Sequence, residues 1–149
     1  MKKILALALG LGLVAISCNQ NHLYMGGTVT LERAQIHVDI ANTDATRALG
    51  LGGRSDINDS EGMWFEFDTA SRYGFWMKDM NFPIDIIWIA NSQVVDITSG
   101  AMPQPGVPDG QLQVYAPQLP VDRVLEVKSG WADRHGVGIG DQVTFTPAQ

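Results

Sequence analysis

The alternation of hydrophobic and polar residues divides most of the chain into short strands. Within residues 28–41 the apolar positions are first odd-numbered and then, from Ile36 to Ile40, even-numbered. A period of two predicts two half-buried strands with a change of register near Arg33. The run from Ile84 to Ile89 is apolar at almost every position, which predicts a strand covered on both faces.

The same pattern predicts further strands over residues 63–67, 74–78, 93–98, 111–115, 121–128 and 142–145. Asn91-Ser92 is expected to be the hairpin turn that leads into the strand at 93–98. Short helices are expected over residues 43–50, with Thr43 as the N-cap and Leu49 packed inward, and over residues 129–136. These elements predict a mainly β fold, a compact antiparallel β-sandwich or barrel with two short helices. The single globular domain is expected to span residues 28–146, followed by a tail at 147–149.

The first eighteen residues have the pattern of an export signal. Basic Lys2 and Lys3 precede an uncharged, mostly apolar run of thirteen residues from Ile4 to Ile16. Such a run is short for a membrane span and typical of a signal peptide. Cys18 follows small residues, as in a bacterial lipobox. We therefore expect residues 1–18 to be a signal peptide and Cys18 to carry a lipid. The alternative is a soluble secreted protein with a free Cys18.

Polar residues 19–27 are expected to form a flexible tether between the lipid and the domain. The protein is therefore predicted to be exported and anchored in the cell envelope, with the membrane as a partner through Cys18.

The net charge of the chain and the spacing of its histidines argue against nucleic-acid binding and against a metal site. The chain has a net charge of −6, which becomes −8 when the two lysines of the signal segment are removed. An acidic protein without a basic cluster is not expected to bind nucleic acid. The three histidines, His22, His37 and His135, are too scattered for a zinc site, so neither a metal nor a cofactor is predicted.

Charged residues interrupt the most apolar part of the chain, Gly74–Ile89. Asp85 lies within a strand whose two faces are both apolar, so we expect its carboxylate to be at least partly buried. A buried carboxylate requires a cation or several hydrogen-bond donors, and Lys78, Arg47 or Arg54 could serve. This group is either a polar cluster at the mouth of a pocket or a structural ion pair that joins neighbouring strands.

In the first interpretation, tryptophan side chains rim the pocket and the charged residues line it. The candidate binding residues are Arg47, Arg54, Trp64, Trp76, Lys78, Asp85 and Trp88. A second possibility is that Asp85 and Glu126 form an acid/base pair, as in a glycosidase, but such a pair needs a set separation across a cleft.

Six ordered segments together resemble one protein family. They are Thr46–Leu51 with Arg54, Gly62–Phe67, Phe75–Lys78, Pro83–Ile86, Val124–Val127 and Gly136 with Gly140–Asp141. In this order and spacing they resemble the domain of unknown function family 192 over residues 28–146. The resemblance implies a small, often exported β domain without an established activity. Gly52 stands where the family usually has Met, and Asp79-Met80 where it usually has Asn-Thr.

Three functions are compatible with these patterns. The first is a membrane-tethered binding or accessory domain for an unknown ligand or protein of the cell envelope. The second is a hydrolase of envelope glycan or peptide that uses Asp85 and Glu126. The third is a purely structural envelope protein. The sequence does not decide whether the chain is an enzyme, because no nucleophile, base and orienting group can be matched to one another.

Overall fold

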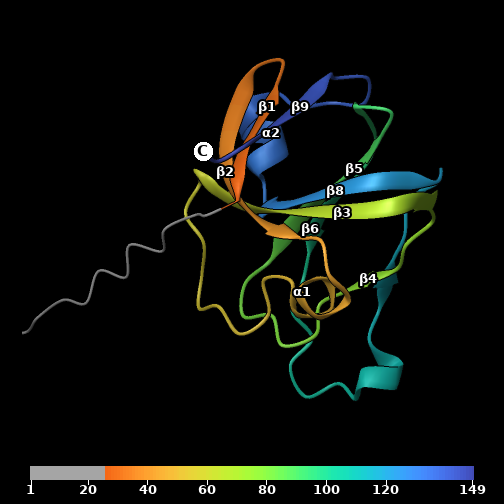
Figure 1. The fold of residues 1–149 in the computed structure, drawn as a ribbon. Helices are drawn as coiled ribbons and strands as arrows, with labels where there is room; N and C mark the ends of the chain where they lie inside the picture. Colours follow the sequence, from red (N-terminus) through yellow and green to blue (C-terminus); the bar gives the residue numbers. More distant parts are fainter. Residues whose placement is uncertain (1–25) are drawn as a thin grey trace, which may run out of the picture.

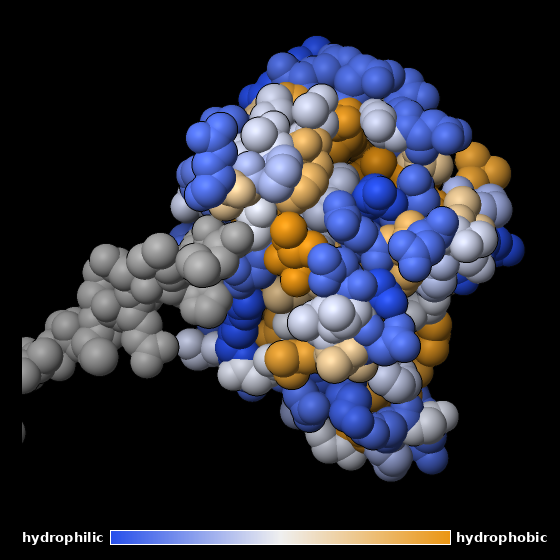
Figure 2. Space-filling view, in the orientation of Figure 1, coloured by the Kyte–Doolittle hydropathy of each residue, from blue (hydrophilic) through white to orange (hydrophobic). Residues whose placement is uncertain are grey.

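The computed structural model describes residues 26–149 (Figure 1). Hydrophilic residues cover most of the face of the domain seen in Figure 2, with hydrophobic residues scattered among them. The expected signal peptide, Cys18 and most of the expected tether lie outside the described residues. The strands are β1 (Gly27–Leu31), β2 (Ala34–Ala41), β3 (Glu61–Ser71), β4 (Phe75–Trp76), β5 (Ile84–Ala90), β6 (Gln93–Ala101), β7 (Val114–Tyr115), β8 (Val121–Lys128) and β9 (Val143–Pro147). The helices are α1 (Asp44–Leu49), α2 (Trp131–His135) and the 3₁₀ turn η1 (Asp109–Gln111). No helix among these residues has the length and apolar character to cross a bilayer.

A curved sheet of seven strands forms most of the domain. Its order is β6-β5-β8-β3-β2-β1-β9, and β4 and β7 pair separately. Neighbouring strands are antiparallel except for β2 and β3, which run parallel because α1 and the loop after it carry the chain back to the start of β3. The mainly β, sandwich-like fold with two short α-helices is confirmed, and the sheet is mixed and not a closed barrel.

The central strands β3, β5 and β8 bury side chains on both faces, and this produces two hydrophobic cores. The α2-side core contains Ile87 and Ile89 of β5 together with Trp131 of α2. The β4-side core contains Ile86 and Trp88 of β5 together with residues near β4. Figure 1 shows α2 on one side of β3 and β8, and α1 and β4 on the other. Full burial of an isoleucine stabilises a fold by about 1.5–3 kcal/mol, so the doubly covered β5 is a major source of stability.

The two edges of the curved sheet meet at one corner and enclose the α2-side core. The Val94 N–H at the start of β6 donates to the Asp141 carbonyl oxygen at 2.9 Å, and the Gly140 N–H donates to the Val94 carbonyl oxygen at 2.8 Å. Just before β6, Asn91 and Ser92 both have positive φ, at 51° and 59°. The expected two-residue hairpin between β5 and β6 is thus confirmed, and its turn also fixes the corner.

Helix α1 differs from expectation in how it packs. Thr43 caps it as predicted, accepting a hydrogen bond from the Thr46 N–H at 3.2 Å. The prediction that Leu49 packs inward is wrong, because its side chain is 65% exposed and Leu51 is the buried residue. Gly50 has φ of 52°, so the chain turns sharply after the helix and Leu51 enters the core in place of Leu49.

Asp85 connects three elements through backbone donors. The residue is 1% exposed, as expected for its position in β5. Its Oδ1 accepts the Gly100 N–H of β6 at 2.9 Å, and its Oδ2 accepts the Ala132 N–H in the first turn of α2 at 3.2 Å. A carboxylate at this position satisfies two backbone groups that would otherwise lack an acceptor.

The expected ion pair between Lys78 and Asp85 is wrong. Lys78 follows β4 on the opposite side of the sheet, and its Nζ lies 2.5 Å from Oδ2 of Asp109. A buried carboxylate can be compensated by hydrogen-bond donors as well as by a cation, and at Asp85 the two backbone N–H groups do so.

We predict that Asp85→Ala lowers the free energy of unfolding by about 2–4 kcal/mol, because two buried N–H groups lose their acceptor. Urea unfolding followed by circular dichroism measures the change. Asp68→Ala, which removes an exposed aspartate of β3, is the matched control and should change stability by less than about 0.5 kcal/mol. Equal stabilities of the two variants would contradict an anchoring role for Asp85.

Candidate functional site

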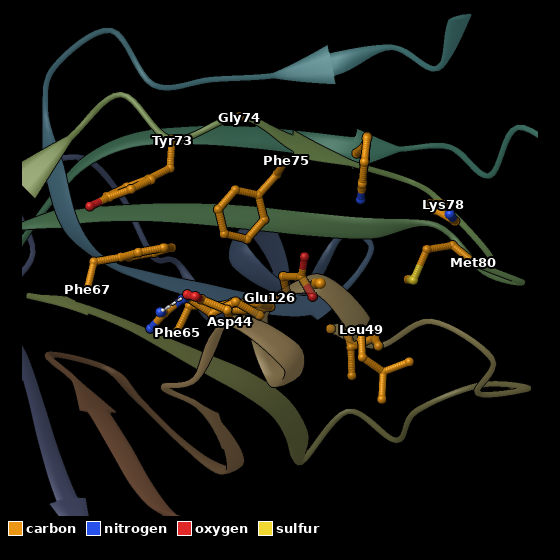
Figure 3. Close-up of a pocket in the computed structure, with 15 residues that line it drawn as sticks. Asp44, Leu49, Phe65, Phe67, Tyr73, Gly74, Phe75, Lys78, Met80 and Glu126 are labelled. Carbon is orange, nitrogen blue, oxygen red and sulfur yellow. Dashed lines mark hydrogen bonds and ion pairs between the residues drawn. The ribbon is translucent and has the colours of Figure 1, made fainter. Parts of the chain in front are cut away.

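A pocket of about 250 Å³ opens on the β4 side of the sheet, between α1 and the segment that contains β4 (Figure 3). Its walls are mainly aromatic and aliphatic, and its charged residues are few. The lining residues are Asp44, Arg47, Ala48, Leu49, Gly50, Leu51, Phe65, Phe67, Tyr73, Gly74, Phe75, Trp76, Lys78, Met80 and Glu126.

Glu126 of β8 lies at the bottom of this pocket. On the neighbouring strands its partners in register are Met63 and Ile86, both members of the β4-side core. The residue is 5% exposed, and its buried Oε2 has no hydrogen-bond partner within residues 26–149. Burial raises the pKa of the Glu126 carboxyl from 4.5 to about 8, although the charge of Arg54 acts in the opposite direction. At neutral pH the Glu126 carboxyl is therefore mostly protonated.

Gly50 leaves the space above the Glu126 carboxyl open. A Cβ atom at this position would lie 3.6 Å from Oε2 of Glu126 and 3.5 Å from the Phe65 ring. A larger side chain would extend over the carboxyl, and the φ of 52° would strain any residue with a Cβ. The glycine that ends α1 thus also leaves room beside the Glu126 carboxyl.

Aromatic rings form the wall between Glu126 and the pocket mouth. Phe75 projects toward Glu126 from β4 (Figure 3) and meets Phe65 edge to face, with ring centroids 4.9 Å apart. Phe67 and Tyr73 stack at 3.7 Å with nearly parallel planes. Contacts of this kind hold each ring in place, so the wall is largely preformed.

Two cations lie over aromatic faces at the rim of the pocket. The Arg47 guanidinium is 5.3 Å from the centre of the Phe67 ring, and the Lys78 Nζ is 5.9 Å from that of Trp76. Each cation also has an acidic partner, Asp44 at 2.7 Å for Arg47 and Asp109 at 2.5 Å for Lys78. The Asp109 carboxylate raises the pKa of Lys78, which therefore stays charged in the neutral range.

The pocket brings together three of the seven candidate binding residues, Arg47, Trp76 and Lys78, and adds Glu126. Arg54 lies outside it and pairs with Asp39 at 2.7 Å. Asp85 is buried on the opposite face of the sheet, where it holds α2.

The other two candidate tryptophans, Trp64 and Trp88, are core residues and do not form the expected pocket rim. Trp64 belongs to the α2-side core, stacks on Phe145 at 5.6 Å and donates from Nε1 to Glu66 at 3.1 Å. Trp88 is fully buried and donates from Nε1 to Thr98 at 3.0 Å. Both indole N–H groups are satisfied internally, which is typical of structural tryptophans.

The structure does not bring Asp85 and Glu126 together as an acid/base pair. Asp85 lies opposite Val127, the residue after Glu126, and successive residues of a strand point to opposite faces. Asp85 bonds α2 on one side of the sheet, whereas Glu126 lines the pocket on the other. Because the sheet separates the two carboxyl groups, they cannot act on one bond.

Sequence reasoning singled out Glu126 only as a partner of Asp85 and missed most of the wall. Glu126 lies between the apolar residues Leu125 and Val127 in a strand that is covered on both faces. This position in the sequence was the signal for a buried carboxyl. The aromatic residues Phe65 and Phe75 stood in recognised segments, but their convergence depends on the pairing of distant strands.

The fold and the site define a small mixed-sheet β domain with an aromatic pocket beside α1. The sequence profile of DUF192, described as an uncharacterized ACR, matches residues 27–145. The chain therefore belongs to the domain of unknown function family 192, as its sequence segments suggested.

Two solved structures share the fold. A protein from Sinorhizobium meliloti 1021, described provisionally as a transcription regulator, is 27% identical with a TM-score of 0.73, over 82% of this chain and 95% of that one. A protein of unknown function from Novosphingobium aromaticivorans is 30% identical with a TM-score of 0.70, over 80% of this chain and 83% of that one. None of the curated proteins compared with the chain matches it.

The raised pKa of Glu126 predicts a stability that depends on pH. Between pH 4.5 and about 8 the folded state binds more protons than the unfolded state, so stability falls as pH rises. The loss approaches about 1.4 kcal/mol per pH unit for one proton. In Glu126→Gln this contribution is absent, so the stability of the variant relative to wild type should increase up to about pH 8 and then remain constant.

Urea unfolding at several pH values measures this difference. The pKa of Asp59 is lowered by His135 and Arg134, but this contribution is shared by both proteins and cancels in the comparison. Glu32→Gln, at an exposed position, is the control and should follow the wild-type curve. A constant difference between Glu126→Gln and wild type across the range would contradict a buried, protonated Glu126.

Proposed function

We propose that this protein is a membrane-tethered, cell-envelope domain that binds a small ligand in the pocket above Glu126. The observation that carries the proposal is the Glu126 carboxyl, which lines an aromatic pocket and whose buried Oε2 has no hydrogen-bond partner among the described residues. Buried polar atoms are nearly always paired, and an unpaired one at the bottom of a pocket is a partner offered to a ligand or to water.

The composition of the pocket supports a binding function. Ligand sites are concave and mostly apolar, with a few polar groups that orient the ligand. Here the aromatic wall supplies apolar contact area and Glu126 supplies one orienting group at the deepest point. The two rim cations, Arg47 and Lys78, already have acidic partners, whereas the buried Oε2 of Glu126 has no hydrogen-bond partner in the part of the chain that the structure describes.

A hydrolytic function has less support. The candidate acid/base pair, Asp85 and Glu126, is divided by the sheet. Asp44 is the second acid among the described lining residues, but it is exposed and paired with Arg47, and this arrangement favours binding over bond cleavage.

Blocking the pocket tests its role. Ala48 of α1 lines the pocket, and Ala45 is an exposed residue of the same helix that does not. We expect small aromatic fragments, screened against the purified full-length protein by ligand-observed NMR, to bind wild type and Ala45→Phe. Binding to Ala48→Phe should be at least about tenfold weaker, because a phenyl ring at this position occupies the mouth.

The fragment set should contain equal numbers of neutral, cationic and anionic compounds, so that the test does not depend on the charge of the ligand. Fragments that bind all three proteins equally, or an absence of binding to wild type, would refute a ligand site in this pocket and favour a structural role for the domain.

The tether has a separate test. If Cys18 carries a lipid, Cys18→Ala should move the protein from the membrane fraction of cells to the soluble exported fraction. Ser17→Ala, which keeps the cysteine and a small neighbouring residue, is the control and should leave the protein in the membrane fraction. Equal solubility of the wild-type protein and Cys18→Ala would contradict lipid anchoring without affecting the pocket.

A further inference from the structure

We infer that the occupant of this pocket is a small organic ammonium compound, whose charged nitrogen donates to Glu126 and whose apolar body lies against the aromatic wall. This inference rests on the proposed function and specifies the chemistry of its ligand. It is drawn from the acceptor at the bottom of the pocket, from the way the wall already contacts cations, and from the charge of the domain.

The bottom of the pocket offers an acceptor and no competing cation. Glu126 Oε2 is buried and unpaired within the described residues. Arg54, the cation whose charge influences Glu126, is held by Asp39 at 2.7 Å and does not line the pocket. A ligand cation that reaches the carboxyl would therefore be its first close charged partner, and a buried carboxylate is strongly stabilised by such a partner.

The wall has aromatic faces of the kind that attract cations. Phe67 and Trp76 each have a side-chain cation of the protein within 6 Å of their ring centres, which shows that these rings attract positive charge. Phe65 and Phe75 lie deeper, around the space that Gly50 leaves above Glu126. A carboxylate beside aromatic faces is the combination that recognises organic ammonium groups.

The mouth and the overall charge fit the same type of ligand. Leu49 and Trp76 line the pocket and are 65% and 46% exposed, so an apolar body that extends from the ammonium group would cover them. The chain carries a net charge of −6, and an acidic protein attracts small cations over distance. Arg47 and Lys78 are locally compensated by Asp44 and Asp109, which reduces their repulsion of a cationic ligand.

Matched probes test the charge of the ligand directly. We would compare 2-phenylethylammonium with 2-phenylethanol, which has the same shape but no charge, by calorimetric titration of the full-length protein. The ammonium compound should bind wild type at least about tenfold more tightly than the alcohol at about pH 8. Because Glu126 must lose its proton to pair with the ammonium group, the affinity should rise from about pH 6 to about pH 8, and titration in two buffers should detect a released proton.

Variants separate a direct contact from a general effect of charge. Glu126→Gln should remove most of the preference for the ammonium compound and the proton release, while the affinity for the alcohol changes by less than about threefold. Glu66→Gln, at a partly buried glutamate of β3 outside the pocket, is the matched control and should retain the preference. Unfolding curves of both variants establish that they are folded before binding is compared.

The outcomes distinguish this inference from the proposed function. If both probes bind and both are blocked by Ala48→Phe, but the alcohol binds as tightly as the ammonium compound, the pocket is a ligand site and the ammonium assignment is wrong. The same conclusion holds if Glu126→Gln keeps the full preference. If neither probe binds wild type, the proposed function and the inference fail together. Tighter binding of Nα-acetyl-lysine amide than of 2-phenylethylammonium would indicate a protein lysine and overturn a small-molecule ligand.

Discussion

Burial of the central strands on both faces is the constraint on which the rest of this structure depends. Where β5 and β8 are covered on both faces, a polar side chain has no route to bulk solvent and must find its partner within the layer that it faces. Asp85 finds two backbone N–H groups and thereby joins β6 and α2 to β5. Glu126 faces the other layer, where its Oε2 has no hydrogen-bond partner within residues 26–149. The same requirement thus produces a structural anchor on one face and a candidate ligand contact on the other.

The two carboxyl groups have different tasks because their surroundings differ, although the residue types are similar. An apolar pocket favours the neutral form of a carboxyl, and burial accordingly raises the pKa of Glu126 to about 8. A domain that retains an incompletely paired carboxyl in its interior gives up stability there, and sites of this kind are commonly functional sites.

The pocket depends on small irregular elements supported by a regular sheet. The sheet supplies Phe65 and Glu126, whereas α1 and β4 contribute the mouth and the outer wall. Gly50 connects α1 with the sheet, because it ends α1, directs Leu51 into the core and leaves room above Glu126. Binding chemistry on short elements that a rigid sheet positions is a common arrangement in proteins.

The sequence by itself determined the fold class, most of the strands, the cap of α1, the hairpin at Asn91 and the family, because these depend on local periodicity, turn residues and ordered segments. It also indicated that Asp85 would be buried, since parity places it among isoleucines. Only the tertiary structure decided the partners: Lys78 and Asp85 are close in sequence but lie on opposite sides of a sheet. The order in which distant strands pair placed Glu126 beneath the aromatic wall and separated it from Asp85, and no local pattern encodes that order.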